Sequence, residues 1–498
     1  MITSLKVYIW DEEIGRLLWD KNRRLPYFEY NPTFIMRGPD ISPFVHPINS
    51  SGSRMPIYGN KDEKYQNLPA FLADSLPDSW GNQLFEQWRV QSKISNSEVT
   101  PLEKLSFIGK RGMGALEYIP EVEKMVSKEK IVLTNLIDLA HRIYQDRENV
   151  VIRADESLTI KSLIAVGTSA GGRQPKAIIA INKESGEIRS GQINNMDGYD
   201  YYILKFNDPE RSFSELEMTY YEMAKLAGID MMECRLLEVG GTQHFLTRRF
   251  DREDGGKLHT QTLAALSPGC DSYEKLLQVC RKMRLSETVC EEVFRRMVFN
   301  IITNNTDDHD KNFSFIMNRK GKWKLSPAYD ITFIFNKGGY QPQKSRCLMA
   351  RGKVIDISRN DVLDFASDNG IRRPNSIIND VINAAKQFRA IALKYNVNEQ
   401  WLGLVESCIN DNLKEWGKLP DSNNHINYIW HNHNISDLRI EQVYKGNYHL
   451  LANVDNKEMK FIFRKGTPEF IMITKYGISQ LPETLLKKLA EDYLFNKL

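Results

Sequence analysis

The chain has 498 residues and a mass of 57.6 kDa, and at about 100–200 residues per domain this length predicts several folded units. Hydrophobic residues make up 41% and charged residues 26%, which are ordinary globular values and exclude collagen-like, fibrous and wholly disordered chains. The 67 Lys and Arg against 64 Asp and Glu leave a net charge of +3, too balanced for a dedicated nucleic-acid coat but compatible with a local basic patch.

The composition also predicts a compartment. No stretch approaches the about 18–20 apolar residues that span a bilayer. Asp11, Glu12 and Glu13 fall where a secretory signal needs an apolar core, so we predict a soluble cytoplasmic protein with no membrane partner. The 6 cysteines form no CxxC pair, which argues against zinc and disulfide frameworks and favours reduced structural thiols.

The N-terminal part predicts a sheet followed by helices. Residues 5–35 alternate apolar and polar side chains around Gly15, which is typical of a small antiparallel sheet. Residues 39–67 are rich in Gly, Pro, Ser and Asn and predict a loop. Apolar residues at helical spacing then predict helices over 69–89 and 131–146.

The middle of the chain predicts a second, mixed unit. The apolar run 163–166 predicts a strand that leads into a Gly-rich loop over 167–172. Further strands are predicted at 177–181, 201–206, 234–239 and 243–250. An amphipathic helix over 212–227, closed by Gly228, separates the second from the third of these strands.

The remainder is mostly helical and ends in an appended unit. Helices are predicted at 288–303, 376–395 and 400–416, with a hairpin at 313–318 and 322–325. After Pro420, strand-like runs at 438–443, 447–454 and 459–464 precede a helix near 482–495. The sequence therefore predicts an α+β protein with a mixed first half, a mostly helical second half and a small C-terminal α+β extension.

The strongest chemical signal is the segment NTDDHDKNF at 305–313, followed by YDI at 329–331. Phosphoryl transfer needs a carboxylate near the attacking hydroxyl and oxygen ligands for Mg²⁺. Asp307 and Asn312 have the Asp-to-Asn spacing of a kinase catalytic loop. The predicted hairpin would return Asp330 beside Asn312, so that this pair holds the metal while Asp307 accepts a proton. Alone, the acidic segment would equally fit a solvated turn, because Asn and Asp are common in loops.

Two further features fit a phosphate-binding lobe. In the Gly-rich loop, small residues let backbone N–H groups approach phosphate oxygens, and Lys176 would add charge, although such a loop alone is more often a hairpin turn. Lys205 lies in an apolar strand and must reach solvent, a carboxylate or a ligand. Glu217 opens the following helix, which matches the strand-Lys and helix-Glu pair of a kinase N-lobe, although an edge-strand Lys is common in isolation.

A third feature is the segment FLTRRFDR at 245–252, which ends the small-lobe strands just before the helical half. A hinge that contacts adenine through backbone groups belongs at this place in a kinase. Without the other features, a charged strand end would explain the segment equally well.

Together these motifs resemble those of the HipA family, the serine/threonine kinase toxins of bacterial type II toxin–antitoxin modules. The matching segments run in family order over about residues 1–415, most of the chain. They read SLPDSWG at 75–81, GMGAL at 112–116, GTSAGG at 167–172, PK at 175–176, RFDR at 249–252, TDDHDKN at 306–312 and PAYD at 327–330.

The resemblance implies a bilobal, protein-kinase-like fold with a mostly helical C-lobe, and it implies ATP and Mg²⁺. The implied domains are an N-terminal HipA subdomain at 1–120, the rest of the kinase N-lobe at 121–250, the helical C-lobe at 251–418 and an extension of unknown role at 419–498.

Residue roles follow from the same resemblance. Asp307 matches the catalytic base and Lys205 the lysine that grips the ATP phosphates, and Asn312 and Asp330 match metal-coordinating positions. Asp307, Lys205 and Asn312 are thereby the implied catalytic residues. Other matches fall in nucleotide-contacting stretches: Gly171, Gly172, Lys176, Arg248, Arg249, Phe250, His309, Lys311 and Tyr329.

The resemblance also implies regulation and partners. Ser169 matches the serine that family members autophosphorylate, and a phosphate there would add about −1.5 to −2 charges to the loop that cradles ATP, so repulsion or loop ejection would switch the kinase off. Family members typically phosphorylate an aminoacyl-tRNA synthetase and arrest translation. Their partner is a small HipB-like helix-turn-helix antitoxin, so DNA is met mainly through that antitoxin, and a dimer stays open.

One position departs from the family pattern, and two other functions stay open. Asp308 replaces the glycine often found after the catalytic aspartate and adds negative charge beside the base and metal site. A catalytically weak co-repressor is one alternative, against which the intact set of Asp307, Asn312, Asp330 and Lys205 argues. A small-molecule kinase is the other, because fold does not settle substrate.

Overall fold

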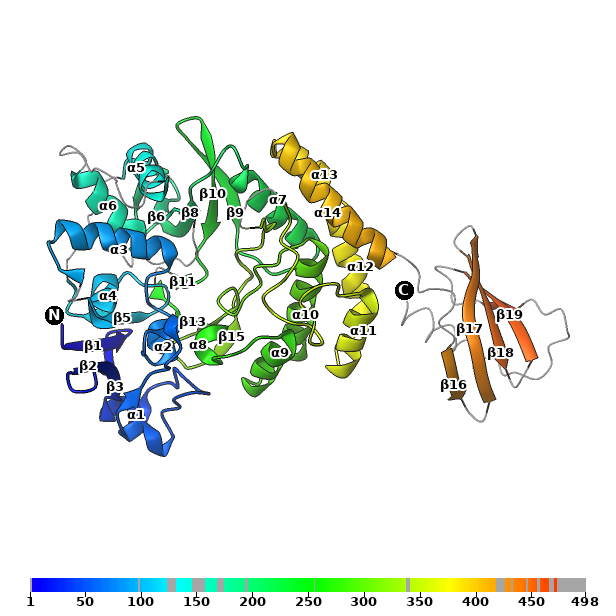
Figure 1. The fold of residues 1–498 in the computed structure, drawn as a ribbon, viewed down its shortest axis with the longest axis horizontal. Helices are drawn as coiled ribbons and strands as arrows, with labels where there is room; N and C mark the ends of the chain where they lie inside the picture. Colours follow the sequence, from blue (N-terminus) through cyan, green and yellow to red (C-terminus); the bar gives the residue numbers. More distant parts are fainter. Residues whose placement is uncertain are drawn as a thin grey trace.

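The first unit of the protein is a five-stranded antiparallel sheet, drawn in blue and cyan in Figure 1. The structure is a computed structural model, and the residues it describes are 2–96, 99–122, 131–145, 157–167, 174–192, 196–254, 256–336, 341–417 and five strands within 426–472. Along the first strand Leu5, Val7 and Ile9 are buried, and this alternation confirms the sheet predicted for residues 5–35. The strands run in the order β4-β3-β2-β1-β5, with bounds β1 (Ser4–Ile9), β2 (Glu12–Asp20), β3 (Leu25–Tyr30), β4 (Ile57–Tyr58) and β5 (Leu116–Ile119).

Short helices complete this N-terminal unit. They are α1 (Pro32–Arg37), α2 (Ala70–Ala73), α3 (Ser79–Gln91), α4 (Pro101–Ile108) and the 3₁₀ turns η1 (Ser51–Arg54) and η2 (Glu63–Tyr65). The single helix predicted over 69–89 is in fact two, because Pro77 lies between α2 and α3 and cannot continue a helix. Asp78 then caps α3, since its carboxylate accepts the Gly81 N–H at 2.5 Å.

The second unit, the N-lobe, holds a five-stranded antiparallel sheet in the order β7-β6-β8-β10-β9. Its strands are β6 (Lys176–Asn182), β7 (Ile188–Ser190), β8 (Tyr199–Lys205), β9 (Cys234–Val239) and β10 (Thr242–Arg248), which confirm the four predicted strands. Its helices are α5 (Leu133–Gln145), α6 (Ser157–Gly167) and α7 (Phe213–Leu226). Helix α6 packs on β6, and α7 packs on β9 and β10.

The strand predicted at 163–166 is wrong, because these residues form the end of α6. A short apolar run fits a buried helix as well as a strand when periodicity is the only guide. Leu163, Ile164 and Val166 are all buried, in one cluster with residues of α3, α5 and β6. The last turn of α6 is enclosed on several sides and shows no polar face, and this hid its period.

The C-lobe is mostly helical. Its helices are α8 (Leu263–Leu266), α9 (Tyr273–Lys282), α10 (Glu287–Ile302), α11 (Arg359–Asp368), α12 (Pro374–Ala385), α13 (Phe388–Lys394) and α14 (Glu399–Gly417). A two-stranded ribbon of β11 (Arg252–Glu253) and β12 (Gly256–Lys257) precedes a sheet of β13 (His259–Thr262), β14 (Ser314–Met317) and β15 (Trp323–Leu325). The predicted hairpin is β14–β15, and the helix predicted at 376–395 is divided into α12 and α13 around Lys386 and Gln387.

Helix α10 forms the centre of the C-lobe core. Val293, Met297 and Ile301 recur at helical spacing and are buried, as the sequence predicts. The helix ends at Ile302, and the chain then enters the loop that carries the predicted catalytic segment. The position of this loop is therefore set by the packing of α10.

The C-terminal extension contains an antiparallel meander in the order β16-β17-β18-β19-β20. Its strands are β16 (Ile426–Trp430), β17 (His433–Tyr444), β18 (Asn447–Val454), β19 (Lys457–Arg464) and β20 (Phe470–Met472), and they include the three predicted runs. The helix predicted near 482–495 lies outside the described residues. Among the residues that are described, no helix combines the length and apolar character that crossing a membrane requires.

Candidate active site

A cavity of about 440 Å³ lies where the N-terminal unit, the N-lobe and the C-lobe meet. Each part contributes wall residues, among them Asp74, Asp78 and Met113 from the first, Lys205, Glu217, Phe245 and Phe250 from the second, and Asp307, Asn312, Tyr329 and Asp330 from the third. The volume falls within the range usual for small-molecule and cofactor sites. The lining also includes apolar residues, among them Ile203, Met231 and Ala328.

Lys205 sits at the charged end of this cavity between two carboxylates. Strand β8 carries Lys205 and helix α7 carries Glu217, and the lysine Nζ lies 2.6 Å from Glu217 Oε2. A second ion pair joins Lys205 to Asp330, 125 residues further along the chain. The predicted strand-lysine and helix-glutamate pair is thus present, and Asp330 completes a triad around one cation.

The pKa values in the triad show how strongly the groups depend on one another. Burial would lower the pKa of Lys205, but the charges of Asp330 and Glu217 outweigh burial and raise it, so the lysine stays charged. Burial favours the neutral acid in Asp330, yet Lys205 lowers the pKa of this carboxyl below its ordinary value. In Glu217 burial prevails over Lys205 and raises the pKa. Asp330 therefore carries the firmer negative charge.

The backbone of Asp330 lies in the left-handed region, with φ of +52°. Such a conformation is uncommon outside glycine, although Asp and Asn tolerate it best. The preceding Tyr329 is anchored on both sides, because its hydroxyl lies 2.5 Å from the Ser314 hydroxyl and donates to the Lys311 carbonyl at 2.7 Å. These contacts tie the Asp330 segment to the end of the predicted catalytic loop, residues 305–313, which is called the catalytic loop below.

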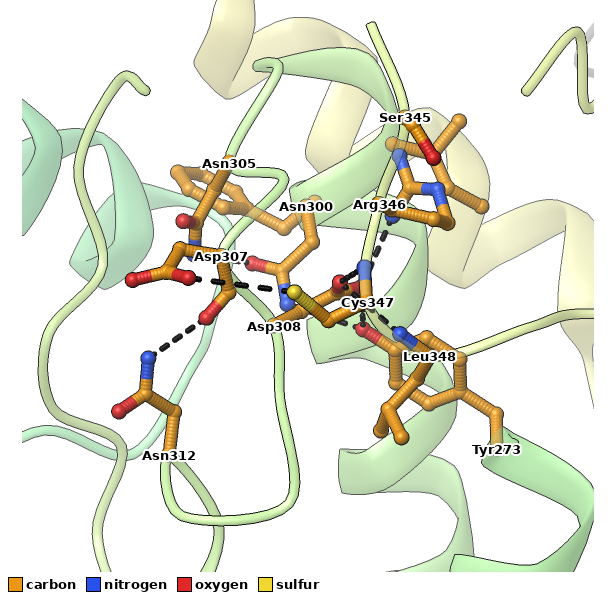
Figure 2. A network of polar contacts seen from close by, with 12 residues as sticks. Tyr273, Asn300, Asn305, Asp307, Asp308, Asn312, Ser345, Arg346, Cys347 and Leu348 are labelled. Carbon is orange, nitrogen blue, oxygen red and sulfur yellow. Dashed lines mark hydrogen bonds and ion pairs between the residues drawn. The ribbon is translucent and has the colours of Figure 1, made fainter. Parts of the chain in front are cut away.

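The catalytic loop follows α10, and Figure 2 shows its polar contacts. Asn312 donates from Nδ2 to the Asp307 carbonyl oxygen at 2.6 Å, which fixes the spacing of these two residues across the turn. The Asp307 side chain is 50% exposed, and His309 Nε2 lies 3.8 Å from its Oδ2. The Asp307 carboxylate therefore remains accessible to a substrate hydroxyl, as a general base requires.

Asp308 faces away from this open side. Its side chain is 0% exposed and pairs with Arg346, so the structure buries and neutralises the charge that the sequence placed beside the base and metal site. The reason is the turn of the loop, since neighbouring side chains point to opposite sides of an extended segment. The buried carboxylate of Asp308 also accepts a hydrogen bond from the Tyr273 hydroxyl.

The predicted hinge residues line the cavity in different ways. Arg248 is half-exposed and pairs with Asp200 at 2.8 Å. Arg249 is buried, its guanidinium bonds the carboxylate of Asp251, and its backbone N–H donates to the Tyr201 carbonyl at 2.8 Å. The Phe250 ring lies 5.4 Å from that of Tyr329, centroid to centroid.

The buried carboxylate of Asp251 also explains part of the GMGAL motif. Gly114 has φ of +76° and donates its N–H to Asp251 Oδ2 at 2.7 Å. A Cβ on this glycine would lie 2.8 Å from the Thr260 backbone nitrogen, so a larger residue would not fit without a shift.

The other predicted site residues fall into three groups. Ser169, Gly171 and Gly172 lie outside the described residues. Lys176 is buried behind the cavity wall, where its Nζ lies 3.4 Å from Asp78 Oδ2, and its charge acts on Asp330 and Glu217. His309 and Lys311 line the cavity.

Sequence reasoning missed the N-terminal unit as part of the site. Asp74 accepts both the Thr262 N–H at 2.7 Å and the Thr262 hydroxyl at 2.6 Å, although 188 residues separate them. Lys64 pairs with Asp310 of the catalytic loop at 3.0 Å, and the Tyr65 hydroxyl donates to the Ala264 carbonyl. The SLPDSWG motif at 75–81 was the available signal, since it puts Asp78 at the cavity.

The residues that line the cavity fit a nucleotide with Mg²⁺. Asn312 uses its amide nitrogen on the loop, so its side-chain oxygen is directed elsewhere, and Lys205 bonds one oxygen of Asp330, Oδ1. Amide and carboxylate oxygens are the donors that Mg²⁺ prefers, with substrate phosphates completing the shell. In the described part of the chain, no three His, Cys, Asp or Glu side chains gather as a metal cluster, so a metal here needs such additional ligands.

Comparisons with known proteins agree with this geometry. Models of the HipA N-terminal domain and of the HipA-like C-terminal domain match residues 5–119 and 168–388. A putative kinase of Haemophilus influenzae is 30% identical over 200 residues, which cover 36% of this chain and 56% of that protein. The chain thus spans little more than half the length of that relative.

A second relative matches over more of its length. The serine/threonine-protein kinase toxin HipA of Shewanella oneidensis is 20% identical over 418 residues, covering 78% of this chain and 88% of the toxin. A solved complex of Shewanella oneidensis HipA with HipB and operator DNA is similar in structure, with a TM-score of 0.59 at 17% identity over 83% of this chain and 97% of that one. This match shows that the predicted kinase-like α+β fold is correct.

Proposed function

We propose that this chain, which belongs to the HipA family of kinases, transfers the terminal phosphate of ATP to a serine or threonine hydroxyl of a protein. The observation that carries the proposal is that Lys205, Asp307, Asn312 and Asp330 line one cavity. A kinase needs a base, metal ligands and a phosphate-binding cation at one place, and these four residues supply them. The substrate class and the partners given below are likewise proposals and do not follow from the kinase-like fold alone.

Each residue has a defined task in the proposed reaction. Asp307 accepts the proton of the hydroxyl as its oxygen attacks the terminal phosphorus, and the bond to the bridging oxygen breaks to release ADP. Lys205 offsets the phosphate charge while Glu217 holds the lysine in place. Asn312 and Asp330 would hold Mg²⁺, which supplies further positive charge to the phosphate oxygens when bound. The apolar residues Ile203, Met231 and Ala328 suit a base ring.

Regulation and partners follow from the family. We propose that Ser169 is autophosphorylated and that the added charge of about −1.5 to −2 blocks ATP binding. We also propose that the chain is the toxin of a HipBA-like module, with a HipB-like helix-turn-helix antitoxin as partner. The Shewanella HipA of the solved complex is bound to HipB and operator DNA, which supports this partner. An aminoacyl-tRNA synthetase is the proposed protein substrate, with growth arrest and persistence as the outcome.

The test is to incubate the purified chain with ATP and Mg²⁺ and record its intact mass, with Asp307→Asn in parallel. We expect one added phosphate that maps to Ser169 and is absent from the variant, while ATP binding is retained. No added phosphate on a chain that was unphosphorylated at the start would contradict the protein-kinase proposal. ATP consumption only with an added metabolite would then identify a small-molecule kinase, and ATP binding without turnover a catalytically weak co-repressor.

A further inference from the structure

Asp308 lies at the centre of a buried network of polar contacts (Figure 2). Unlike Asp307, it does not line the cavity. Its Oδ2 accepts the Tyr273 hydroxyl at 2.6 Å and Arg346 Nη1 at 2.9 Å. Its Oδ1 accepts the backbone N–H groups of Cys347 at 2.9 Å and Leu348 at 3.3 Å. Both carboxylate oxygens are thus fully used, and a buried charge with such partners holds a fixed position.

The network extends behind Asp308 as a chain of donors. Asn305 Nδ2 donates to Asn300 Oδ1 at 3.0 Å, and Asn300 Nδ2 donates to the Tyr273 hydroxyl at 3.1 Å. The tyrosine in turn donates to the Asp308 carboxylate. Every bond therefore points toward the negative charge, and bonds aligned in this way polarise and strengthen one another. The charge on Asp308 organises helices α9 and α10 as well as the loop.

In front of Asp308, the network fixes the segment 343–348 along the catalytic loop. The Cys347 N–H also bonds the Thr306 carbonyl at 3.1 Å, and Asn304 Nδ2 donates to the Gln343 carbonyl at 3.1 Å. Burial alternates along the segment, because Arg346 and Leu348 are buried while Ser345 and Cys347 are exposed. The segment is therefore an extended strip with one side anchored in the C-lobe.

The exposed side of this strip lies next to the proposed base. Cys347 Sγ is 3.9 Å from Asp307 Oδ1, a contact drawn as a dashed line in Figure 2. If ATP occupies the cavity beside Lys205, the hydroxyl to be phosphorylated must reach Asp307 from outside. The strip at 345–347 then forms the wall along which the acceptor approaches.

We propose that Asp308 is a positioning residue, which holds the strip 343–348 against the catalytic loop and thereby sets the acceptor side of the site relative to Asp307. The inference rests on the proposed kinase function and deepens it. Asp308 touches no substrate, and its effect passes through Arg346, Tyr273 and the backbone at 347–348. A small displacement of reacting groups is enough to slow an enzyme about 100-fold.

Two readouts test the inference in Asp308→Asn. The first is the autophosphorylation rate at saturating ATP together with the ATP Kd. We expect the rate to fall about 30- to 100-fold while the Kd stays within about twofold, because only the acceptor side shifts. A merely structural role would change the amount of folded protein but not the rate per folded molecule.

The second readout uses Cys347 itself and needs no catalysis. Partial burial of this otherwise exposed side chain and the charges of Asp307 and Asp308 raise the pKa of the thiol to about 12, so alkylation in the intact protein is slow. We expect iodoacetamide to modify Cys347 at least about fivefold faster in Asp308→Asn, measured on the Cys347 peptide by mass spectrometry. This readout still tests the network if the wild-type chain shows no kinase activity, so the two failures are distinguishable.

Matched variants complete the design. Asp411→Asn removes an exposed carboxylate of α14, which pairs with Lys414 at 3.2 Å, and should leave both readouts unchanged. Arg346→Lys keeps the buried charge and should retain more activity than Arg346→Met, and these variants serve if Asp308→Asn does not fold. A folded Asp308→Asn with wild-type rate and wild-type Cys347 alkylation would overturn the inference.

Discussion

Asp307 and Asp308 are neighbours with the same side chain, yet they lie in opposite surroundings. Asp307 is 50% exposed, and its side-chain neighbours among the described residues are loose, with His309 at 3.8 Å and Cys347 at 3.9 Å. Asp308 is 0% exposed and accepts four hydrogen bonds. A carboxylate left with free lone pairs can take a proton, whereas one whose lone pairs are filled can only hold structure. One residue along the chain thus separates a candidate for chemistry from an anchor.

Among buried carboxylates like that of Asp308, Asp251 gives the largest expected effect. Arg249 and Arg252 both pair with this one carboxylate, which is 0% exposed. Asp251→Asn leaves two buried guanidinium groups without their anion. We expect a loss of about 3–5 kcal/mol in the free energy of unfolding, measured in urea. Asp208→Asn removes an exposed carboxylate 3.7 Å from Arg211 and should cost less than about 0.5 kcal/mol. Equal losses in the two variants would break the comparison.

The next prediction concerns the cavity side of the comparison, where the proposed role of Lys205 is to offset the phosphate charge. Lys205→Met should slow phosphoryl transfer about 10²- to 10³-fold, or about 2.7–4 kcal/mol, because the phosphates lose their cation. Lys275→Met removes an exposed lysine paired with Asp271 at 2.9 Å and is the matched control. Single-turnover rates on protein shown to be folded would decide, and a wild-type rate in Lys205→Met would exclude this lysine from the mechanism.

Lowering the pH tests how burial affects a titratable group without any mutation of the loop. His259 on β13 is buried, and burial lowers its pKa to about 3, so the folded protein keeps it neutral while the unfolded chain takes up a proton below its ordinary pKa of 6.5. Its contribution to stability is therefore complete above pH 6.5 and is lost by about 1.4 kcal/mol per pH unit as the pH falls from 6.5 toward 3.

Urea unfolding at pH 7, 6 and 5 measures this slope. His259→Gln should flatten it, and His309→Gln, which alters a ring on the open side of the loop, should not. An unchanged slope in His259→Gln would show that other groups take up the protons.

The smallest expected effect is at Tyr273, which supplies one bond to Asp308. Tyr273→Phe removes that hydroxyl, which also accepts from Asn300 Nδ2, but leaves the other three bonds to Asp308, so we expect a loss of about 1.5 kcal/mol in the free energy of unfolding. Tyr58→Phe, which removes an exposed hydroxyl 3.4 Å from Asp20, should be neutral within error. A loss of stability in Tyr273→Phe as large as that in Asp251→Asn would mean that the hydrogen bonds of the Asp308 network are strongly cooperative.

Local patterns predicted much of the fold. Alternation predicted the sheet at 5–35 and the N-lobe strands, and helical spacing predicted α10, because each of these elements has one buried face. The strand prediction at 163–166 failed because this last turn of α6 is enclosed and shows no polar side. The helices predicted at 69–89 and 376–395 were continuous in pattern but are broken in the structure.

The candidate site was predictable only where spacing or family motifs carried it. Lys205, Glu217, Asp307, Asn312 and Asp330 do surround one cavity, and their roles in catalysis stay predictions. The contacts of Asp308 with Arg346 and of Asp74 with Thr262 join residues 38 and 188 positions apart. No local pattern marks such pairs, because tertiary folding alone brings them together.

The N-terminal unit touches both lobes, and this has a consequence for motion. Asp78 holds Lys176 of the N-lobe, while Asp74 and Lys64 hold Thr262 and Asp310 of the C-lobe. A kinase whose lobes are joined only by a hinge can rock open to exchange nucleotide. Here the N-terminal unit bonds both lobes as well, so an opening of the lobes must also break some of these contacts. If the cavity binds a nucleotide as proposed, these added contacts would slow its release.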